Sequence, residues 1–100
     1  MIGKRDQVKR AEQIKIRINT EFDRIARALA SAAARQTGLE RMDTEAVIVI
    51  LEDKRTEIMA KSQASYFINN WRELSHDVRE LIAQDPAYRA IHTQRARRRQ

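Results

Sequence analysis

Glycine and proline are almost missing from the interior of this chain. Between Lys4 and Asp85 there is one glycine, Gly38, and no proline. These two residue types are the strongest breakers of regular structure, and the remaining residues are mostly good helix formers such as Ala, Leu, Glu, Gln, Lys and Arg. The sequence therefore predicts an all-α fold dominated by a long helical hairpin.

The same two residue types place the expected helix boundaries. Gly38 suits the left-handed residue that follows a helix, so the hairpin is expected to turn there. Helices are predicted over about residues 4–37 and 44–84. Pro86 suits the first position of a new helix, which predicts a short C-terminal helix over residues 86–98.

The length of the chain limits how it can bury apolar surface. One hundred residues make one domain at most, here residues 1–100 with a basic N-terminal segment (1–19) and a basic C-terminal tail (95–100). Each helix of a long hairpin touches only one partner, so an apolar stripe stays in water unless a second copy covers it. We therefore expect an oligomer, at least a dimer.

Several classes of protein are disfavoured by composition. There is no cysteine, which removes disulfides and cysteine zinc sites. The longest apolar run, residues 46–51, is far shorter than the ~20 residues that span a bilayer. The first residues lack the apolar segment of a signal peptide. We expect a soluble, cytoplasmic protein without a membrane partner.

Positive charge gathers at both ends of the chain. The net formal charge is +6. Residues 1–19 hold six basic and two acidic side chains, and residues 86–100 hold five arginines and no acid. One or two arginines could serve a helix C-terminus, but the tail exceeds that need. A nucleic-acid partner is predicted for its end, whose candidate residues are Arg95, Arg97, Arg98 and Arg99.

An apolar seam is expected in the second half of the chain. Its members recur three and four residues apart, which is the period of a coiled coil. Upstream the apolar spacing has another phase, so a kink or break is expected within residues 61–65. The seam is predicted to contact a second copy or another helical protein, and it consists of Phe67, Trp71, Leu74, Val78 and Leu81.

Residues 14–19 alternate apolar and polar side chains. On a strand, Ile14, Ile16 and Ile18 would share one face. On a helix, Ile16 would lie about 200° from the other two and point at water or into a second interface. Both interpretations remain open at this stage: one long helix, or a short strand before a helix that begins near residue 20.

In the second interpretation, residues 14–58 resemble ribbon-helix-helix DNA-binding proteins, with a short strand, a helix, a glycine turn and a helix in that order. The resemblance implies that two chains pair their strands into a ribbon that enters the major groove. It further implies that Lys15, Arg17 and Asn19 face base edges, for which arginine and asparagine have suitable donors and acceptors.

The sequence contains no pattern that indicates catalysis. There is no nucleophile motif, no phosphate-binding loop and no converging set of metal ligands, so no enzyme activity, cofactor or metal is expected. Two functions remain. The chain either associates with nucleic acid, with DNA as the first expectation, as a repressor or a plasmid or phage accessory factor, or acts as a helical adaptor, scaffold or inhibitor that binds proteins.

Overall fold

The computed structural model describes residues 1–71 and 74–99, and the side chains of residues 1–71 and 76–98. All regular elements in these ranges are helices, so the all-α prediction is confirmed. They form an elongated body of 53 × 23 × 20 Å. In chain order the helices are α1 (Arg5–Arg35), α2 (Gly38–Met59), α3 (Ala64–Asn70), α4 (Leu74–Ala83) and α5 (Pro86–Arg99).

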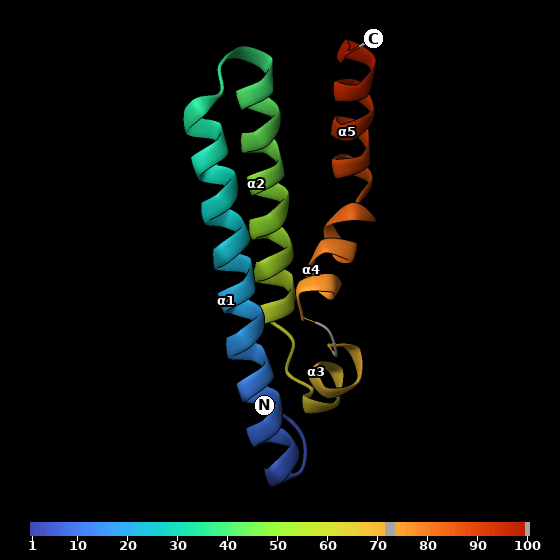
Figure 1. Ribbon diagram of the computed structural model, residues 1–100. Helices are drawn as coiled ribbons and strands as arrows, with labels where there is room; N and C mark the ends of the chain where they lie inside the picture. Colours follow the sequence, from blue (N-terminus) through green and yellow to red (C-terminus); the bar gives the residue numbers. More distant parts are fainter. Residues whose placement is uncertain (72–73, 100) are drawn as a thin grey trace.

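The two long helices, α1 and α2, run antiparallel and side by side along most of the body (Figure 1). Only Gln36 and Thr37 separate them, and Gly38 has a left-handed φ of 59°. The predicted start of the second helix near residue 44 is therefore wrong. Leu39 to Met42 are good helix formers, so the helix continues directly from the glycine turn and needs no loop.

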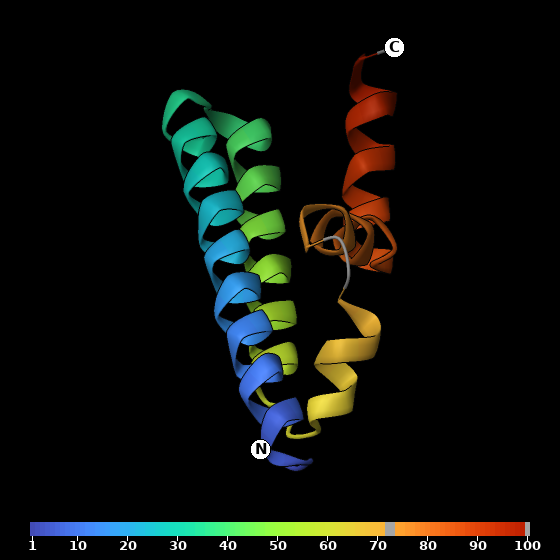
Figure 2. The same ribbon diagram turned by 60° about the horizontal axis from the view of Figure 1, so that its bottom comes forward.

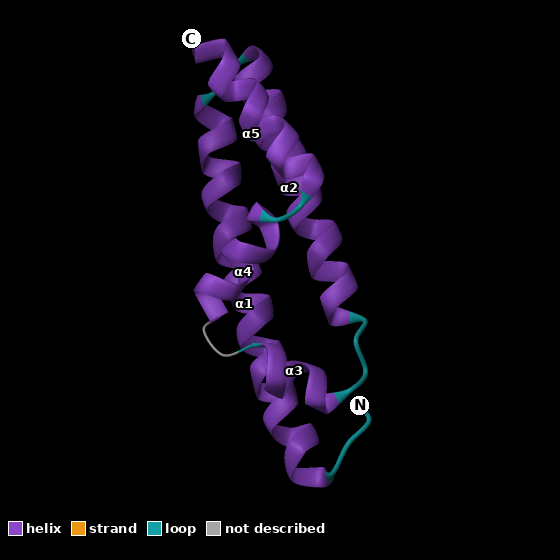
Figure 3. Cartoon of the chain, turned by 90° about the vertical axis from the view of Figure 1, so that its right-hand side faces the viewer, coloured by secondary structure: helices purple, strands orange, loops and turns teal. Residues whose placement is uncertain are grey.

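The predicted single helix over residues 44–84 is also wrong, because α2, α3 and α4 occupy this range. The first break lies between Met59 and Ala64, where the sequence predicts a kink. The second break, after Asn70, is not predicted. Figure 3 shows α3 and α4 as two separate helices. Phe67 of α3 and Val78 of α4 are nevertheless both fully buried in the same core.

The N-terminus is tied to the loop that precedes α3. Ile2 N donates a hydrogen bond to Ser62 O at 2.6 Å, and Ala64 N donates to Ile2 O at 2.8 Å. Gly3 has a φ of 152°, and a Cβ built there would lie 2.9 Å from Ala64 Cβ. A side chain at residue 3 has no room, so glycine permits the close approach of the two segments.

The core lies between the hairpin and the C-terminal helices. Its largest fully buried side chains come from four helices: Ile18, Phe22, Leu51, Phe67 and Val78. Ala11 and Ala64 are also fully buried, and such small side chains let helices approach closely. The core is thus built from α1, α2, α3 and α4. Because one side of α1 is buried in it, the core determines which side chains of α1 reach solvent.

The last helix begins at a strong cap. Asp85 Oδ1 accepts hydrogen bonds from Ala87 N at 2.8 Å and Tyr88 N at 3.3 Å, and Pro86 occupies the first helical position. Asp85 also pairs with Lys54 Nζ of α2 at 3.3 Å. The observed helix, Pro86–Arg99, agrees with the prediction over residues 86–98. It runs beside α2 in both views (Figures 1 and 2).

Candidate nucleic-acid interface

A row of arginines follows one flank of α1, on the side of α3 and α4. Arg10, Arg17 and Arg24 are seven residues apart, which is nearly two helical turns, and Arg35 follows three turns later. All four side chains are exposed, and the row runs beside the face of α1 that is buried in the core. We call these four residues the arginine stripe. Successive members at seven-residue spacing stand about 10.5 Å apart along the helix axis.

Most of the stripe has no acidic partner among the residues that the structure describes. Arg24 alone is paired: its guanidinium bonds to Glu21, with Nε 3.2 Å from Oε2. The hydrogen bond and the negative charge of Glu21 raise the pKa of Arg24 above its ordinary value. Arg10, Arg17 and Arg35 form no ion pair with any residue that the structure describes. Their positive charges therefore face solvent and are available to an anionic partner.

The strand interpretation of residues 14–19 is not what the structure shows, because these residues lie within α1. Lys15 and Arg17 therefore point to different sides of one helix instead of sharing a face. Ile16 is 67% exposed, as the helical interpretation predicts. The ribbon face implied by the family resemblance is not formed, since the core that α1 makes with α2 and α3 fixes this segment as helix.

Lys15 and Asn19 belong to the side of α1 that faces the end of α2. Together with Ile16 and Met59 they line a shallow pocket. Lys15 is half-buried, and its Nζ lies 5.9 Å from the centroid of the Phe67 ring, within the range of a cation–π contact. Of the three predicted N-terminal contact residues, only Arg17 belongs to the arginine stripe.

The arginines of the tail do not act as a free arm. Arg95 Nη2 donates to Thr44 Oγ1 at 2.8 Å and to Glu40 O at 3.2 Å, and its Nε lies 3.5 Å from Asp43 Oδ2. Arg98 forms an ion pair with the same carboxylate of Asp43. The start of α2 thus holds α5 through acidic and polar groups. We call this contact the Asp43 clamp.

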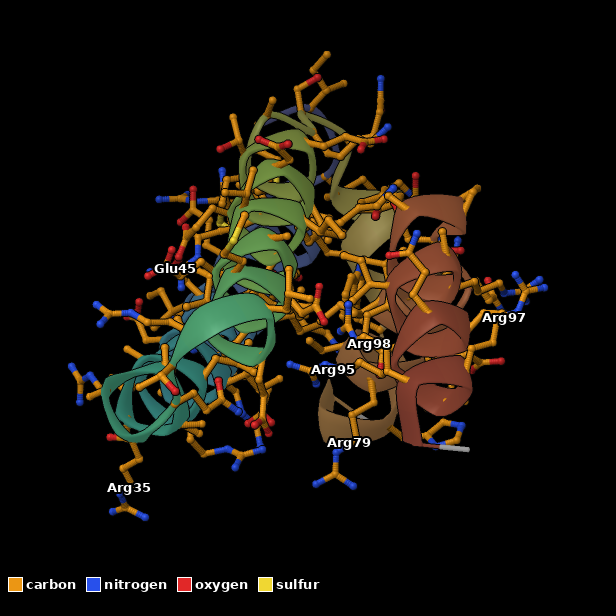
Figure 4. All side chains as sticks on the ribbon, turned by 90° about the horizontal axis from the view of Figure 1, so that it is seen from above. Arg35, Glu45, Arg79, Arg95, Arg97 and Arg98 are labelled. Carbon is orange, nitrogen blue, oxygen red and sulfur yellow. The ribbon has the colours of Figure 1, made fainter. Side chains whose placement is uncertain are left out.

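The other tail arginines differ from these two. Figure 4 shows Arg97 extending away from α2, whereas Arg95 and Arg98 lie between α5 and α2. Arg97 is exposed. The side chain of Arg99 lies outside the described residues. The predicted tail site therefore divides into a clamped pair and one arginine that faces solvent.

The apolar seam that was predicted to bind a partner packs largely in the core of this chain. Phe67 and Val78 are fully buried and Trp71 is 7% exposed, all in the core cluster, so the seam is not open to a partner helix. Leu81 is half-buried against that core, and the side chain of Leu74 lies outside the described residues. The correction has a simple cause: the break after Asn70 folds α4 onto the hairpin, so the chain covers its own seam.

Sequence reasoning missed two surfaces. The arginine stripe could have been found from the spacing of arginines, because seven-residue recurrence on a helix marks one face. The second is a row of exposed apolar residues on α2. Leu39, Met42 and Val49 are 58%, 64% and 60% exposed, and Ala46 lies between them in helical spacing. We call these four residues the α2 row.

The described part of the chain shows no metal-binding cluster and no membrane-spanning helix. In it, no group of three or more His, Asp and Glu side chains could hold a metal ion. His76 Nε2 and Glu80 Oε2 form an exposed pair at 3.4 Å. No helix among the described ranges is long and apolar enough to cross a membrane. No protein-family model, curated protein or solved structure matches the chain.

Proposed function

We propose that this chain is a non-enzymatic nucleic-acid-binding protein that contacts phosphates through the arginine stripe of α1, with DNA as the first partner to test. The observation that supports this is the exposure of Arg10, Arg17 and Arg35 without an acidic partner among the described residues. Unpaired guanidinium groups along one rigid helix are a common phosphate-binding surface.

The physical basis is electrostatic. Each arginine that neutralises a phosphate releases condensed counterions, so affinity falls as salt rises. Phosphate contacts position a protein on nucleic acid without reading its base sequence. The interface is therefore proposed to bind nucleic acid through its backbone, with little dependence on base sequence.

The test is binding of a labelled random-sequence duplex, followed by fluorescence anisotropy over a range of salt concentrations. In the variant Arg17→Gln/Arg35→Gln, two stripe charges are lost while the core is untouched. We expect weaker binding and a plot of log affinity against log salt whose slope decreases by about two, one for each lost phosphate contact.

A matched control removes the same charge elsewhere. Arg41 pairs with Glu45 on α2, and Arg89 donates to Ala83 O at 3.1 Å, so neither belongs to the stripe. The double variant Arg41→Gln/Arg89→Gln should keep the wild-type slope. Equal losses in both double variants would mean that only net charge matters, and absence of binding at low salt would reject the proposal.

The proposal includes a dimer, formed by a second copy of this chain on the α2 row. Single exposed apolar residues are ordinary, but the α2 row is continuous along one helix at three- and four-residue spacing. A second copy presents an identical row, and two such rows can pack as a short coiled-coil seam. The dimer would double the number of arginine stripes and so raise the affinity for a long nucleic acid.

The oligomer is tested by sedimentation equilibrium. The variant Met42→Glu/Val49→Glu places charges in the α2 row and should convert the dimer to a monomer. Ile16→Glu is the matched control, because it makes the same kind of change at an exposed apolar residue of α1. A wild-type protein that sediments as a monomer, or a dimer that survives the double substitution, would reject this part of the proposal.

A further inference from the structure

A groove runs between α1 and α3 beside the arginine stripe. Its polar lining consists of Arg10, Gln13, Arg17 and Asn69, and its apolar lining consists of Ile14, Ile68 and Trp71. The volume is about 580 Å³, within the roughly 300–1,000 Å³ that sites for small ligands occupy. The groove therefore has the size and the mixed lining of a ligand site.

The charge of the groove is positive. Arg10 and Arg17 are two turns apart on α1, and neither is paired with a carboxylate of the described chain. Acidic side chains are absent from the described lining. Two unpaired guanidinium groups at one opening favour an anionic ligand, and phosphate suits the planar arrangement of arginine donors.

The remaining lining complements the rest of a nucleotide. Gln13 and Asn69 each carry one amide oxygen and one amide nitrogen, so together they can accept from and donate to the edge of a base. Ile14, Ile68 and Trp71 offer an apolar wall for the face of a base or sugar. Trp71 is 7% exposed, and its indole Nε1 has no hydrogen-bond acceptor among the described residues.

We infer that this groove binds an unpaired nucleotide, with its phosphate on Arg10 and Arg17 and its base between the two amides and the apolar wall. The inference rests on the proposed nucleic-acid function and adds a preference for single strands or strand ends. In a duplex, the faces of the bases are stacked and could not meet the wall.

The experiment uses the intrinsic fluorescence of Trp71, which is the only tryptophan of the chain and lines the groove. The full chain is titrated with thymidine monophosphate, thymidine and inorganic phosphate, with free tryptophan as the optical control. We expect a saturable change with the monophosphate. Affinity should be at least about tenfold weaker for thymidine, which lacks the charged hydrogen bonds.

Variants locate the site on the groove. Arg17→Gln should weaken monophosphate binding by about tenfold, and Asn69→Ala should weaken it by a smaller factor, because the lost hydrogen bond is neutral. Arg27→Gln is the matched control, since Arg27 is exposed on α1 and does not line the groove. Circular dichroism of each variant checks that the helices are intact.

Three results would overturn the inference: no saturable change with the monophosphate, equal affinity for inorganic phosphate alone, or equal effects of the Arg17 and Arg27 variants. None of these results would predict the outcome of the duplex assay. That assay measures anisotropy of a labelled duplex, and its variant also changes Arg35, a residue outside the groove. Duplex binding without nucleotide binding would leave the arginine stripe as the interface and remove only the groove. Nucleotide binding without duplex binding would support the groove and reject the stripe.

Discussion

Phe67 of α3 is fully buried against the hairpin, whereas Tyr88 of α5 is half-buried beside a hollow of about 530 Å³. That hollow is lined mainly by apolar side chains of the hairpin and of α4, among them Leu29, Val47 and Ile82. At one end of the hairpin the added helix is therefore packed by apolar contact. At the other end the packing is incomplete.

Charged groups replace apolar contact at the α5 end. The Asp43 clamp holds Arg95 and Arg98, and Asp85 at the start of α5 pairs with Lys54. Apolar burial depends little on salt, whereas ion pairs weaken once the screening length falls toward their separation, from about 10 Å at 0.1 M to about 3 Å at 1 M ionic strength. The comparison indicates that α3 is a fixed part of the core and that the attachment of α5 responds to salt, pH and competing anions.

The largest expected effect is loss of the apolar contact at the α3 end. Phe67→Ala should reduce the free energy of unfolding by about 3–5 kcal/mol, a large share of the roughly 5–15 kcal/mol of a small domain. Urea unfolding followed by circular dichroism measures this. Tyr88→Ala should cost clearly less, because that side chain is only half-buried. Equal losses of unfolding free energy in Phe67→Ala and Tyr88→Ala would contradict the difference in packing between the α3 end and the α5 end.

A second substitution tests the N-terminal bridge that supports α3. Gly3→Ala forces a Cβ to 2.9 Å from Ala64 Cβ at a φ of 152°, and such strain costs about 1–3 kcal/mol. Hydrogen exchange of the Ala64 amide, which donates to Ile2 O, should accelerate. Gly38→Ala is the control: it also has a positive φ but has open space around it, so the Ala64 amide should keep its protection.

A smaller effect is expected at the Asp43 clamp. Asp43→Asn removes the negative charge that faces Arg95 and Arg98, so amides of α5 should exchange faster while the core of the hairpin keeps its protection. High salt should produce the same change in the wild type. Glu45→Gln removes a charge that pairs with exposed Arg41, and it should leave α5 unaffected. If the hydrogen-exchange protection of α5 is unchanged both in Asp43→Asn and at high salt, apolar contact rather than the Asp43 clamp holds this helix.

The smallest effect concerns the pH dependence of α5. Partial burial opposes ionisation of Asp85, but the hydrogen bonds from Tyr88 and Ala87 and the pairing with Lys54 lower the pKa of its carboxyl overall. A lowered pKa stabilises the folded state above the unfolded value of about 3.9, and this contribution is lost as pH falls through the folded pKa.

After correction for the intrinsic pH dependence of amide exchange, the protection of the α5 amides should therefore fall between neutral pH and the acid limit of folding. In Asp85→Asn, whose side chain does not titrate, this part of the pH dependence should disappear. A pH dependence of α5 that is the same in both proteins would exclude Asp85 as its source.

The sequence predicted where the helices lie along the chain better than it predicted which helices pack against one another. Gly38 and Pro86 located the hairpin turn and the start of α5, and the change in the phase of apolar spacing located the break after Met59, because these are local properties of the sequence. The break after Asn70 was missed, since no glycine or proline marks it. It depends on where Phe67 and Val78 find buried positions on the hairpin.

The candidate interface shows the same division. Arg17 was selected from the sequence and is exposed in the structure, whereas Lys15 and Asn19 were selected for an alternation that the helix does not use. Trp71 was assigned to a partner seam and lies in the chain's own core. Spacing alone identifies residues that share a face, but it does not say whether that face is covered.

By itself, the sequence determined that this protein is helical, where its long helices turn and that positive charge gathers toward its ends, because propensity and net charge are properties of neighbouring residues. Only the tertiary structure decided which of the arginines are available to a partner. Arg95 meets Thr44 from 51 positions away, while Arg17 meets no acid among the described residues. Pairing of charges depends on which helices lie side by side, and burial of apolar side chains sets that arrangement.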